Sequence, residues 1–580
     1  MGTLLLVPKK LSEILRGWHI CTLTRKLLSL RSLLVLGILA LTVLASLPLF
    51  QFKLMTGHDS YAYLPRVVEF YQGLKAGELF PRWAPDLGGG YGYPIFNFVP
   101  PLFYYVSALF HFLGMPIIAS MDLACFLALL LSGLGMYLFA REFFGPYGGF
   151  LAGIAYVFAP YHLATLYVRS ALGDFMAFAF IPLTLWGIYR FCRDGKHLFL
   201  VMASLSLALL ILSSNHVALI SLPLFILYIA FLAFTARKLA CLLRGGLCLA
   251  TGLSITAFFW LPALLERGFV KVDRALTGYF DYNDHFVYPH QLIYSPWGYG
   301  LSLPGPDDGM SFQIGLVHLV LLIISLVTVK RARLVFSSGK RHLIFFTFIF
   351  ISAAFFTIHE SAFLWARLPL LQYLQFPWRI LTLVVVAVSF ACGFPFLFLE
   401  EGNVRAKNAL LGLCVVAILL FNLPFARPEG AYDIKGADFT PDYIAGHQVK
   451  VMPAHEWEPI WVQDRPSVSA SGRLVLVRGR VTNLLARSVS PTGFTYRLEP
   501  VKNSLMRANI FYFPGWKVYV DGREAKIYVN KSGLMDFYVA KGIHEVRVEF
   551  TDTLVRKWGK GLSVFGFVLM LLTSWLFKPR

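Results

Sequence analysis

Residues 32–50 read SLLVLGILALTVLASLPLF, an apolar run without a charged side chain. At about 20 residues per crossing, a run of this length can span a bilayer as one helix. The polar motif Gly-His-Asp-Ser-Tyr follows at residues 57–61. Basic residues dominate the segment before the run, where Glu13 is the one acid: Lys9, Lys10, Arg16, Arg25, Lys26 and Arg31. The positive-inside rule therefore predicts a cytoplasmic N-terminus and places Asp59 at the outer membrane boundary.

The composition is that of a membrane protein with several spans. Of the 580 residues, 57% are hydrophobic and 14% are charged, and the mean hydropathy is +0.64. A soluble fold does not carry this much apolar surface, so we expect an α-helical polytopic membrane protein. The formal net charge is +20, but its Lys and Arg residues cluster in short loops between apolar runs, where orientation signals lie. Nucleic acid is therefore not expected as a partner.

Twelve apolar runs can be drawn as spans, which puts both termini in the cytoplasm. They are 32–50, 118–140, 148–167, 175–190, 198–215, 217–235, 246–265, 311–329, 342–358, 379–399, 408–425 and 560–577. The apolar segment 101–113 has only 13 residues, a length typical of an interfacial or re-entrant helix. If it does not span, the basic loops all fall on the cytoplasmic side. After a cytoplasmic segment 1–31, a transmembrane domain then covers 32–426.

The predicted long external loop, residues 51–117, contains two recognisable stretches. Helical spacing of apolar residues predicts an amphipathic helix lying on the membrane, built on Leu64, Val67, Val68, Tyr71 and Leu74. The run 87–94, Leu-Gly-Gly-Gly-Tyr-Gly-Tyr-Pro, allows backbone conformations that other residues resist. A plain turn is the favoured interpretation, with close approach to a ligand as the alternative. The run has no phosphate-loop pattern.

Residues 427–557 differ from the rest of the chain. Charged residues become common, and apolar residues alternate in 473–478, 516–520 and 544–550. Asp521-Gly522 is a residue pair favoured in two-residue hairpin turns. We expect an extracytoplasmic β-rich domain that resembles a sandwich. The last helix, within 558–580, would return the chain to the cytoplasm.

Asp59 is the first candidate for chemistry. A carboxylate at the outer boundary is costly to desolvate, which suggests a site, whereas the plainer alternative is that it caps the following helix. The next external loop, residues 169–174, brings Arg169 and Asp174 to the same boundary. Two acids from different loops can share one cavity, one as general base and the other orienting an acceptor or a metal. Alternatively, Arg169 and Asp174 only pair with each other.

Other polar groups fall in the predicted external loops. Arg379 begins a span, where a guanidinium can bind a phosphate through two hydrogen bonds or extend to the lipid headgroups. His216 fits a packing role as well as a site role. The segment 281–285, Asp-Tyr-Asn-Asp-His, has a spacing similar to that of metal ligands, but metal binding is the less favoured interpretation there.

With these residues in view, the chain resembles bacterial membrane glycosyltransferases of the GT-C superfamily. More narrowly, it resembles the polytopic 6-pyruvoyl-tetrahydropterin-synthase-related family and the neighbouring family that glycosylates lipoteichoic acid. The resemblance rests on the order of motifs along nearly the whole chain: residues 57–59, 88–94, 100–102, 169–174, 374–379, 513–516, 520–522 and 542–545. Nothing in the sequence looks like a soluble zinc-dependent pterin synthase.

The resemblance implies that a sugar passes from a polyprenyl-phosphate donor to an envelope glycan, lipid or protein. Transfer would occur at the outer face of the cytoplasmic (inner) membrane, with Asp59 as the general base. Asp174 would be the second acid across the cavity, and Arg379 or Arg169 would hold the donor phosphate. These separate roles suit the chemistry, because phosphate is a good leaving group. The tasks left to the protein are deprotonation of the acceptor and positioning of the substrates.

Two further expectations follow from the resemblance. His58 and His216 complete the predicted substrate-binding set. Metal-dependent relatives carry an Asp-x-Asp pattern in the first loop, but residues 58–61 here read His-Asp-Ser-Tyr. We therefore assign no cofactor, and a divalent metal is not supported by the sequence.

Two other functional classes fit parts of the sequence. One is a transporter or flippase of lipid-linked saccharides, and the other is a non-catalytic scaffold in envelope polymer assembly. Transporters usually keep polar site residues near the middle of the membrane, whereas the polar groups here gather in the predicted external loops. A scaffold has no need for Asp59 and Asp174 to share a cavity.

Overall fold

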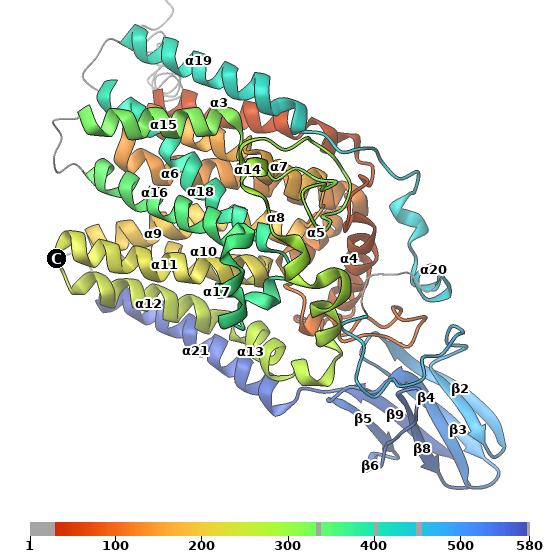
Figure 1. Ribbon diagram of the computed structural model, residues 1–580. Coiled ribbons are helices and arrows are strands. Elements are labelled where there is room, and N and C mark those ends of the chain that lie inside the picture. The colour runs from red at the N-terminus through yellow and green to blue at the C-terminus, as the bar shows by residue number, and fades with distance from the viewer. Residues whose placement is uncertain (1–29, 332–337, 400–403, 448–454, 577–580) are drawn as a thin grey trace, which may run out of the picture.

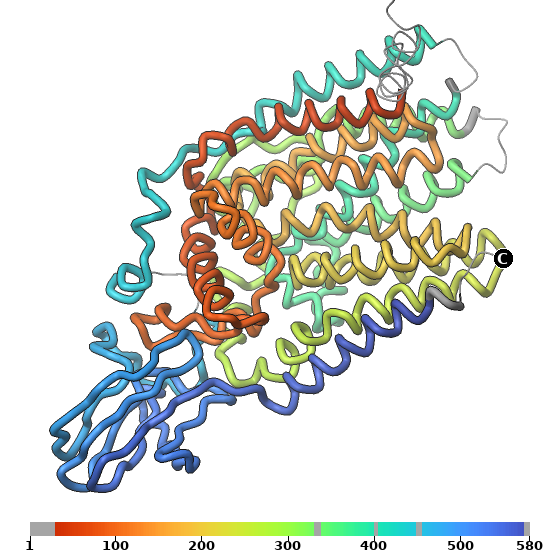
Figure 2. The backbone as a smooth tube through the Cα atoms, turned by 180° about the vertical axis from the view of Figure 1, so that it is seen from behind, coloured from red at the N-terminus to blue at the C-terminus, as the bar shows by residue number. Residues whose placement is uncertain are grey.

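The computed structural model describes residues 30–331, 338–399, 404–447 and 455–576. A bundle of helices makes up most of the molecule, and a domain of β-strands lies at one end of it, which we call the β-domain end (Figure 1). The start of α3 (Leu30–Ala45) and the end of α21 (Leu554–Leu576) lie at the opposite end, which we call the far end (Figure 2). The described chain therefore begins and ends on the side away from the β-domain.

Six helices of the described residues are long and apolar enough to cross a membrane, and a bent pair would make a seventh. In that pair, α12 (Ala240–Ile255) and α13 (Ala257–Leu265) meet at 72°. The six are Ile117–Val157, Leu172–Asp194, Asn215–Ala236, Ser338–Thr357, Pro377–Phe398 and Val404–Phe425. The chain is thus built as a membrane protein with several spans, while the count of twelve stays a prediction.

Glycine and proline explain where the helices depart from the predicted spans. α6 (Ile117–Val157) runs through the predicted gap between two spans and bends at Gly145, whose φ of 72° is left-handed. The predicted span 148–167 is broken before Pro160, which has no amide hydrogen to donate. The other helices are α7 (Pro160–Tyr167), α8 (Leu172–Phe178), α9 (Phe180–Asp194), α10 (His197–Ser213), α11 (Asn215–Ala236), α14 (Pro289–Ile293), α15 (Leu316–Arg331), α16 (Ser338–Thr357), α17 (Ala362–Arg367), α18 (Leu381–Cys392) and α19 (Val404–Asn422).

Two helices of the predicted external loop form a layer at the β-domain end (Figure 1). α5 (Leu102–Phe112) has 11 residues, which is too short to span, as the sequence predicted. α4 (Ser60–Lys75) packs against it, and Leu64 and Val67 of its apolar face are fully buried. The prediction that this face lies on the membrane is therefore wrong, because the face is covered by protein.

The β-domain consists of two antiparallel sheets. One has the strand order β1-β4-β8-β7 and the other the order β2-β3-β9-β5-β6. The strands are β1 (Leu474–Arg478), β2 (Val481–Ser490), β3 (Gly493–Pro500), β4 (Ser504–Phe511), β5 (Trp516–Val520), β6 (Arg523–Ala525), β7 (Tyr528–Val529), β8 (Leu534–Val539) and β9 (His544–Phe550).

Three predicted strands and one predicted turn are confirmed. β1, β5 and β9 match the alternating runs, and Asp521-Gly522 connects β5 to β6 with positive φ at both residues, as a two-residue hairpin turn needs. The first of the nine described strands begins at Leu474, and the boundary of the domain at residue 427 stays a prediction. The described residues between 427 and 473 hold only short helical turns, among them α20 (Pro441–Gly446).

The glycine-rich run connects the β-domain to the bundle. Gly88, Gly89, Gly90 and Gly92 all have positive φ, which a tight turn of this shape requires. The carbonyl oxygen of Gly89 accepts a hydrogen bond from the amide of Ala470 at 2.8 Å. The run is therefore a turn, as the sequence favoured, and it binds the segment that leads into the first strand.

A buried ion pair joins the last helix to the rest of the chain. Arg556, in the first turn of α21, is fully buried and binds Glu266 at 3.0 Å. It also donates to the carbonyl oxygens of Pro514 and Thr551 beside the β-domain. Asn97 donates to the same glutamate at 2.8 Å. The pair thus connects the end of α13, the predicted external loop, the β-domain and α21.

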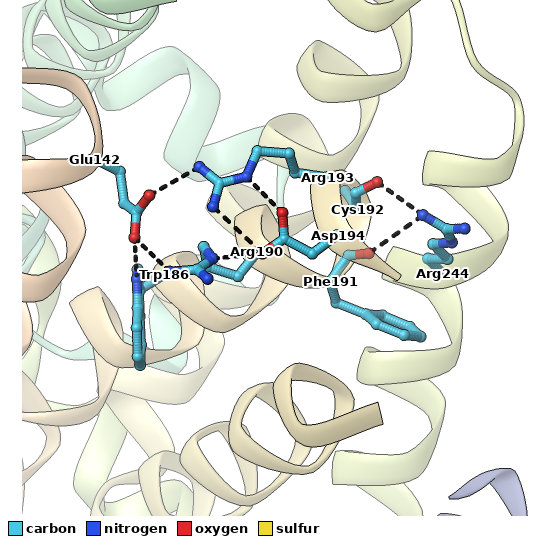
Figure 3. A network of polar contacts seen from close by, with 8 residues as sticks. All are labelled: Glu142, Trp186, Arg190, Phe191, Cys192, Arg193, Asp194 and Arg244. Carbon is cyan, nitrogen blue, oxygen red and sulfur yellow. Dashed lines mark hydrogen bonds and ion pairs between the residues drawn. The ribbon is translucent and has the colours of Figure 1, made fainter. Parts of the chain in front are cut away.

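A second charged network lies at the far end (Figure 3). Glu142 of α6 accepts hydrogen bonds from Arg190 and Arg193 of α9, each at 2.8 Å, and from the indole of Trp186 at 3.1 Å. Asp194 pairs with both arginines. Both carboxylates are therefore paired, and the network joins α6 to α9.

We predict that Arg556→Met lowers the free energy of unfolding by about 3–5 kcal/mol, because Glu266 would keep a buried charge without its partner. The double variant Glu266→Gln/Arg556→Met should be more stable than the single variant, since neither charge remains. Thermal unfolding of the purified protein in detergent measures both. A double variant that is less stable than Arg556→Met would contradict the interpretation.

Candidate functional site

A cavity of about 430 Å³ lies at the β-domain end of the bundle. Its walls come from α4, α8, the start of α11, the turn before α18 and the loops between α13 and α15. It is lined by all six residues that the sequence nominated: His58, Asp59, Arg169, Asp174, His216 and Arg379. The fold thus gathers them from distant parts of the chain, and their chemical roles stay predictions.

Asp59 has a free side chain. It occupies the N-cap position of α4, but its carboxylate makes no capping hydrogen bond. The residue is exposed and lines the cavity. Among the residues that the structure describes, none forms a hydrogen bond or ion pair with this carboxylate. The capping alternative therefore does not account for the side chain, which is available to a substrate.

Close backbone packing holds Asp59 in place. The amides of His58 and Asp59 donate to the carbonyl oxygens of Val168 and Arg169 at 3.1 and 3.0 Å. A Cβ atom on Gly57 would lie 2.1 Å from the hydroxyl of Ser170, so this contact requires glycine. The glycine of the motif thus lets the first loop lie directly against the loop that carries Arg169.

Asp174 is the opposite case, because its carboxylate is fully engaged. It accepts from Arg169 at 3.0 Å and from the hydroxyl of Ser214 at 2.6 Å. The Nδ1 atom of His216 and the Nε atom of Arg379 lie 3.8 and 3.9 Å away. We call Arg169, Asp174, His216 and Arg379 the Asp174 cluster. The predicted alternative of a local Arg169–Asp174 pair is observed, but within a larger cluster that lines the cavity.

The two guanidiniums of the Asp174 cluster are held differently. Arg169 lies over the ring of Trp378, 4.6 Å from its centre, and is paired with Asp174. Arg379 donates through Nη1 to the carbonyl oxygen of Leu374 and the amide oxygen of Gln375. Its Nε is buried and has no hydrogen-bond partner among the described residues. This Nε atom lies 3.9 Å from the Asp174 carboxylate, and its N–H is an unused hydrogen-bond donor among the described residues.

His58 adds no positive charge beside Asp59. Its Nε2 donates to the carbonyl oxygen of Tyr299 at 3.1 Å. Burial lowers the pKa of His58, so the ring is neutral at neutral pH. His58 therefore lines the cavity as a neutral hydrogen-bonding group and is not a counter-ion to Asp59.

Several cavity residues were not nominated from the sequence. Tyr63 and Arg66 follow Asp59 on one face of α4, a spacing of four and seven residues that could have identified them. Trp378 lies inside the motif 374–379, in which the sequence predicted a role for Arg379 alone. Glu456 and Trp457 belong to the segment before the β-domain, and no local signal connects them to the site.

The segment with metal-like spacing is held by hydrogen bonds within the protein. Asp281 accepts hydrogen bonds from the backbone and side chain of Asn283. His285 contacts the carbonyl oxygen of Tyr279 and the hydroxyl of Ser302, and it is buried. Within the described ranges, no group of three or more His, Cys, Asp or Glu side chains could hold a metal ion.

The fold and cavity describe a polytopic membrane protein with a polar site at one end of its helices. Residues 96–426 match the family described as 6-pyruvoyl-tetrahydropterin synthase related domain, membrane protein. Because the match covers more than half of the chain, the protein belongs to this family, as the sequence motifs indicated. A relative from Lactococcus lactis subsp. cremoris (strain MG1363), described as an uncharacterized protein, is 25% identical over 249 residues. The aligned part spans 41% of each chain.

Two solved structures share distant similarity. One is arabinofuranosyltransferase AftD from Mycobacteria, with a TM-score of 0.45 and 14% identity over 70% of this chain and 27% of that chain. The other is the Archaeoglobus fulgidus oligosaccharyltransferase in complex with Zn and sulfate, with a TM-score of 0.38 and 15% identity over 74% and 58%. Similarity at this level carries no argument about function.

We predict that Gly57→Ala destabilises the protein by about 1–3 kcal/mol, because the added methyl group must push Ser170 and its loop aside. Gly246→Ala is the matched control, since its added Cβ meets nothing within 4 Å and helical Gly→Ala changes are usually stabilising. Thermal unfolding compares the two variants. Equal melting temperatures would contradict the close-packing argument.

Proposed function

We propose that this protein is a membrane glycosyltransferase that transfers a sugar from a polyprenyl-phosphate donor to an envelope glycan, lipid or protein. The supporting observation is a free carboxylate, Asp59, that shares one cavity with two guanidiniums at the ends of apolar helices. Such a transfer needs three elements: a base, a site that binds an anion, and a path by which a donor in the membrane reaches that site. The β-domain would face the outside of the cytoplasmic membrane, with both termini in the cytoplasm.

Arg379 is the residue that would hold the donor phosphate. Arg169 is committed to Asp174 at 3.0 Å, whereas the Nε–H of Arg379 lacks a hydrogen-bond acceptor among the described residues. A phosphate oxygen would supply that acceptor through a charge-assisted hydrogen bond. Asp174 would then keep both guanidiniums charged and oriented, and would not itself take a proton.

An apolar groove lies next to the phosphate position. It has a volume of about 330 Å³ and lies between α11, α16 and the start of α18. Its lining is apolar except for Ser352. Ile220 on its wall follows His216 by one turn of α11, and Ile380 follows Arg379 directly. Because groove residues adjoin residues of the Asp174 cluster along the chain, the groove supports a donor that has an anionic head and an isoprenoid tail.

The reaction then needs one proton transfer and one displacement. Asp59 would take the proton from the acceptor hydroxyl as that oxygen forms a bond to the anomeric carbon of the donor sugar. The bond between the anomeric carbon and the phosphate oxygen breaks, and polyprenyl phosphate leaves with the electron pair. Arg379 stabilises the charge that develops on the leaving phosphate. Asp59 later returns its proton to solvent.

Sugar transfer in membranes tests the proposal, with radiolabelled polyprenyl-phosphate sugars as donors. Asp59→Asn is nearly isosteric and should reduce transfer about 100-fold or more, because the base is lost. Asp433→Asn, an exposed carboxylate outside the cavity, should leave transfer unchanged at equal protein level.

Equal transfer by wild type and Asp59→Asn would remove this residue from the mechanism. Absence of transfer in the wild type with all donors tried would contradict the proposed activity.

A further inference from the structure

The cavity extends along α4 from Asp59. Asp59, Tyr63 and Arg66 line it from one face of α4. At 1.5 Å per residue, Arg66 lies about 10 Å along the helix from Asp59. Asp59 itself is fixed beside Arg169 by the 3.0 Å backbone hydrogen bond. Between Asp59 and Arg66 on α4, the hydroxyl of Tyr63 accepts a hydrogen bond from the amide of Gly173, beside Asp174, at 3.0 Å. The cavity is therefore lined along α4 from the Asp174 cluster to Arg66.

A segment that precedes the β-domain forms the wall at the Arg66 end. Trp457 stacks on Phe98, with ring centres 5.2 Å apart and planes within 6°, and both rings line the cavity. Glu456 also lines the cavity and interacts electrostatically with Arg66. This end thus combines aromatic surface with a carboxylate and a guanidinium. Such groups can pack against the C–H face of a sugar ring and hydrogen-bond its hydroxyls.

The segment is fixed in place. Glu458 is buried and binds the ammonium of Lys271 at 2.6 Å. The amide of Lys271 donates to the carbonyl oxygen of Glu458 at 3.1 Å, and the amide of Ile460 donates to Phe269 at the same distance. These contacts start one residue after Trp457. Glu456 and Trp457 are therefore presented to the cavity by a braced segment, which is the arrangement that a binding subsite requires.

We propose that Glu456 and Trp457 form the acceptor subsite and that the acceptor they bind is a saccharide. This inference rests on the proposed function, because the donor phosphate is assigned to the Asp174 cluster. A saccharide against Trp457 would share one cavity with the donor phosphate and with Asp59, the proposed base. The choice of acceptor would then depend on a segment that is far in sequence from the proposed base and phosphate site.

Binding of simple sugars to the full-length protein in nanodiscs tests the subsite without a donor. The probes are the methyl glycosides of glucose, galactose, mannose and N-acetylglucosamine, measured by saturation-transfer NMR. We expect wild type to bind at least one probe. Trp457→Ala and Glu456→Gln should weaken that binding at least tenfold. Tyr538→Ala removes an aromatic ring that is 63% exposed on β8 and should change nothing.

Trp457→Phe controls for folding, because it keeps an aromatic ring and should retain more binding than Trp457→Ala. Probe binding that is equal in wild type and Trp457→Ala would overturn the subsite, as would no binding of any probe to wild type. The result of this binding experiment is independent of the result of the sugar-transfer assay. Probe binding that depends on Trp457, without sugar transfer from any donor, would support the subsite and contradict the transferase.

Discussion

The charge balance around Asp174 is the constraint on which the site depends. The side chains of Arg169, Asp174 and Arg379 are 5%, 12% and 12% exposed, so none of the three charges can be left alone without a cost of several kcal/mol. The loop 169–174 and the turn that carries Arg379 must therefore meet at this point. Of the two acids Asp59 and Asp174, Asp174 is paired with the two cations, whereas Asp59 is not paired. The neighbours of the two carboxylates, and not their residue type, make this difference.

The β-domain is fixed to the site end of the bundle by independent contacts. The glycine-rich turn binds Ala470 through Gly89, and Glu266 binds Arg556 where α21 begins. The Lys271–Glu458 pair adds a third connection. Together they hold the segment with Trp457 against the cavity. The start of the final helix is therefore bound to the same end of the bundle as the site.

The sequence predicts the parts of this protein that have a local signal. Alternation with a period of two identifies β1, β5 and β9, and alternate residues are buried in β5 and β9. The six nominated cavity residues follow from their positions at the ends of apolar runs. Local signals cannot say what covers an apolar face, so the burial of α4 under protein was missed. Trp457 was missed for the same reason, since only the folded chain brings it to Phe98.

A structure of the protein in a nanodisc with bound polyprenyl phosphate tests the central claim most directly. The account predicts the phosphate within hydrogen-bond distance of Arg379 Nε and the isoprenoid chain in the groove between α11 and α18. It also predicts that the Asp59 carboxylate stays free to face the position of the sugar. A phosphate bound away from the Asp174 cluster, with this cavity empty, would contradict the account.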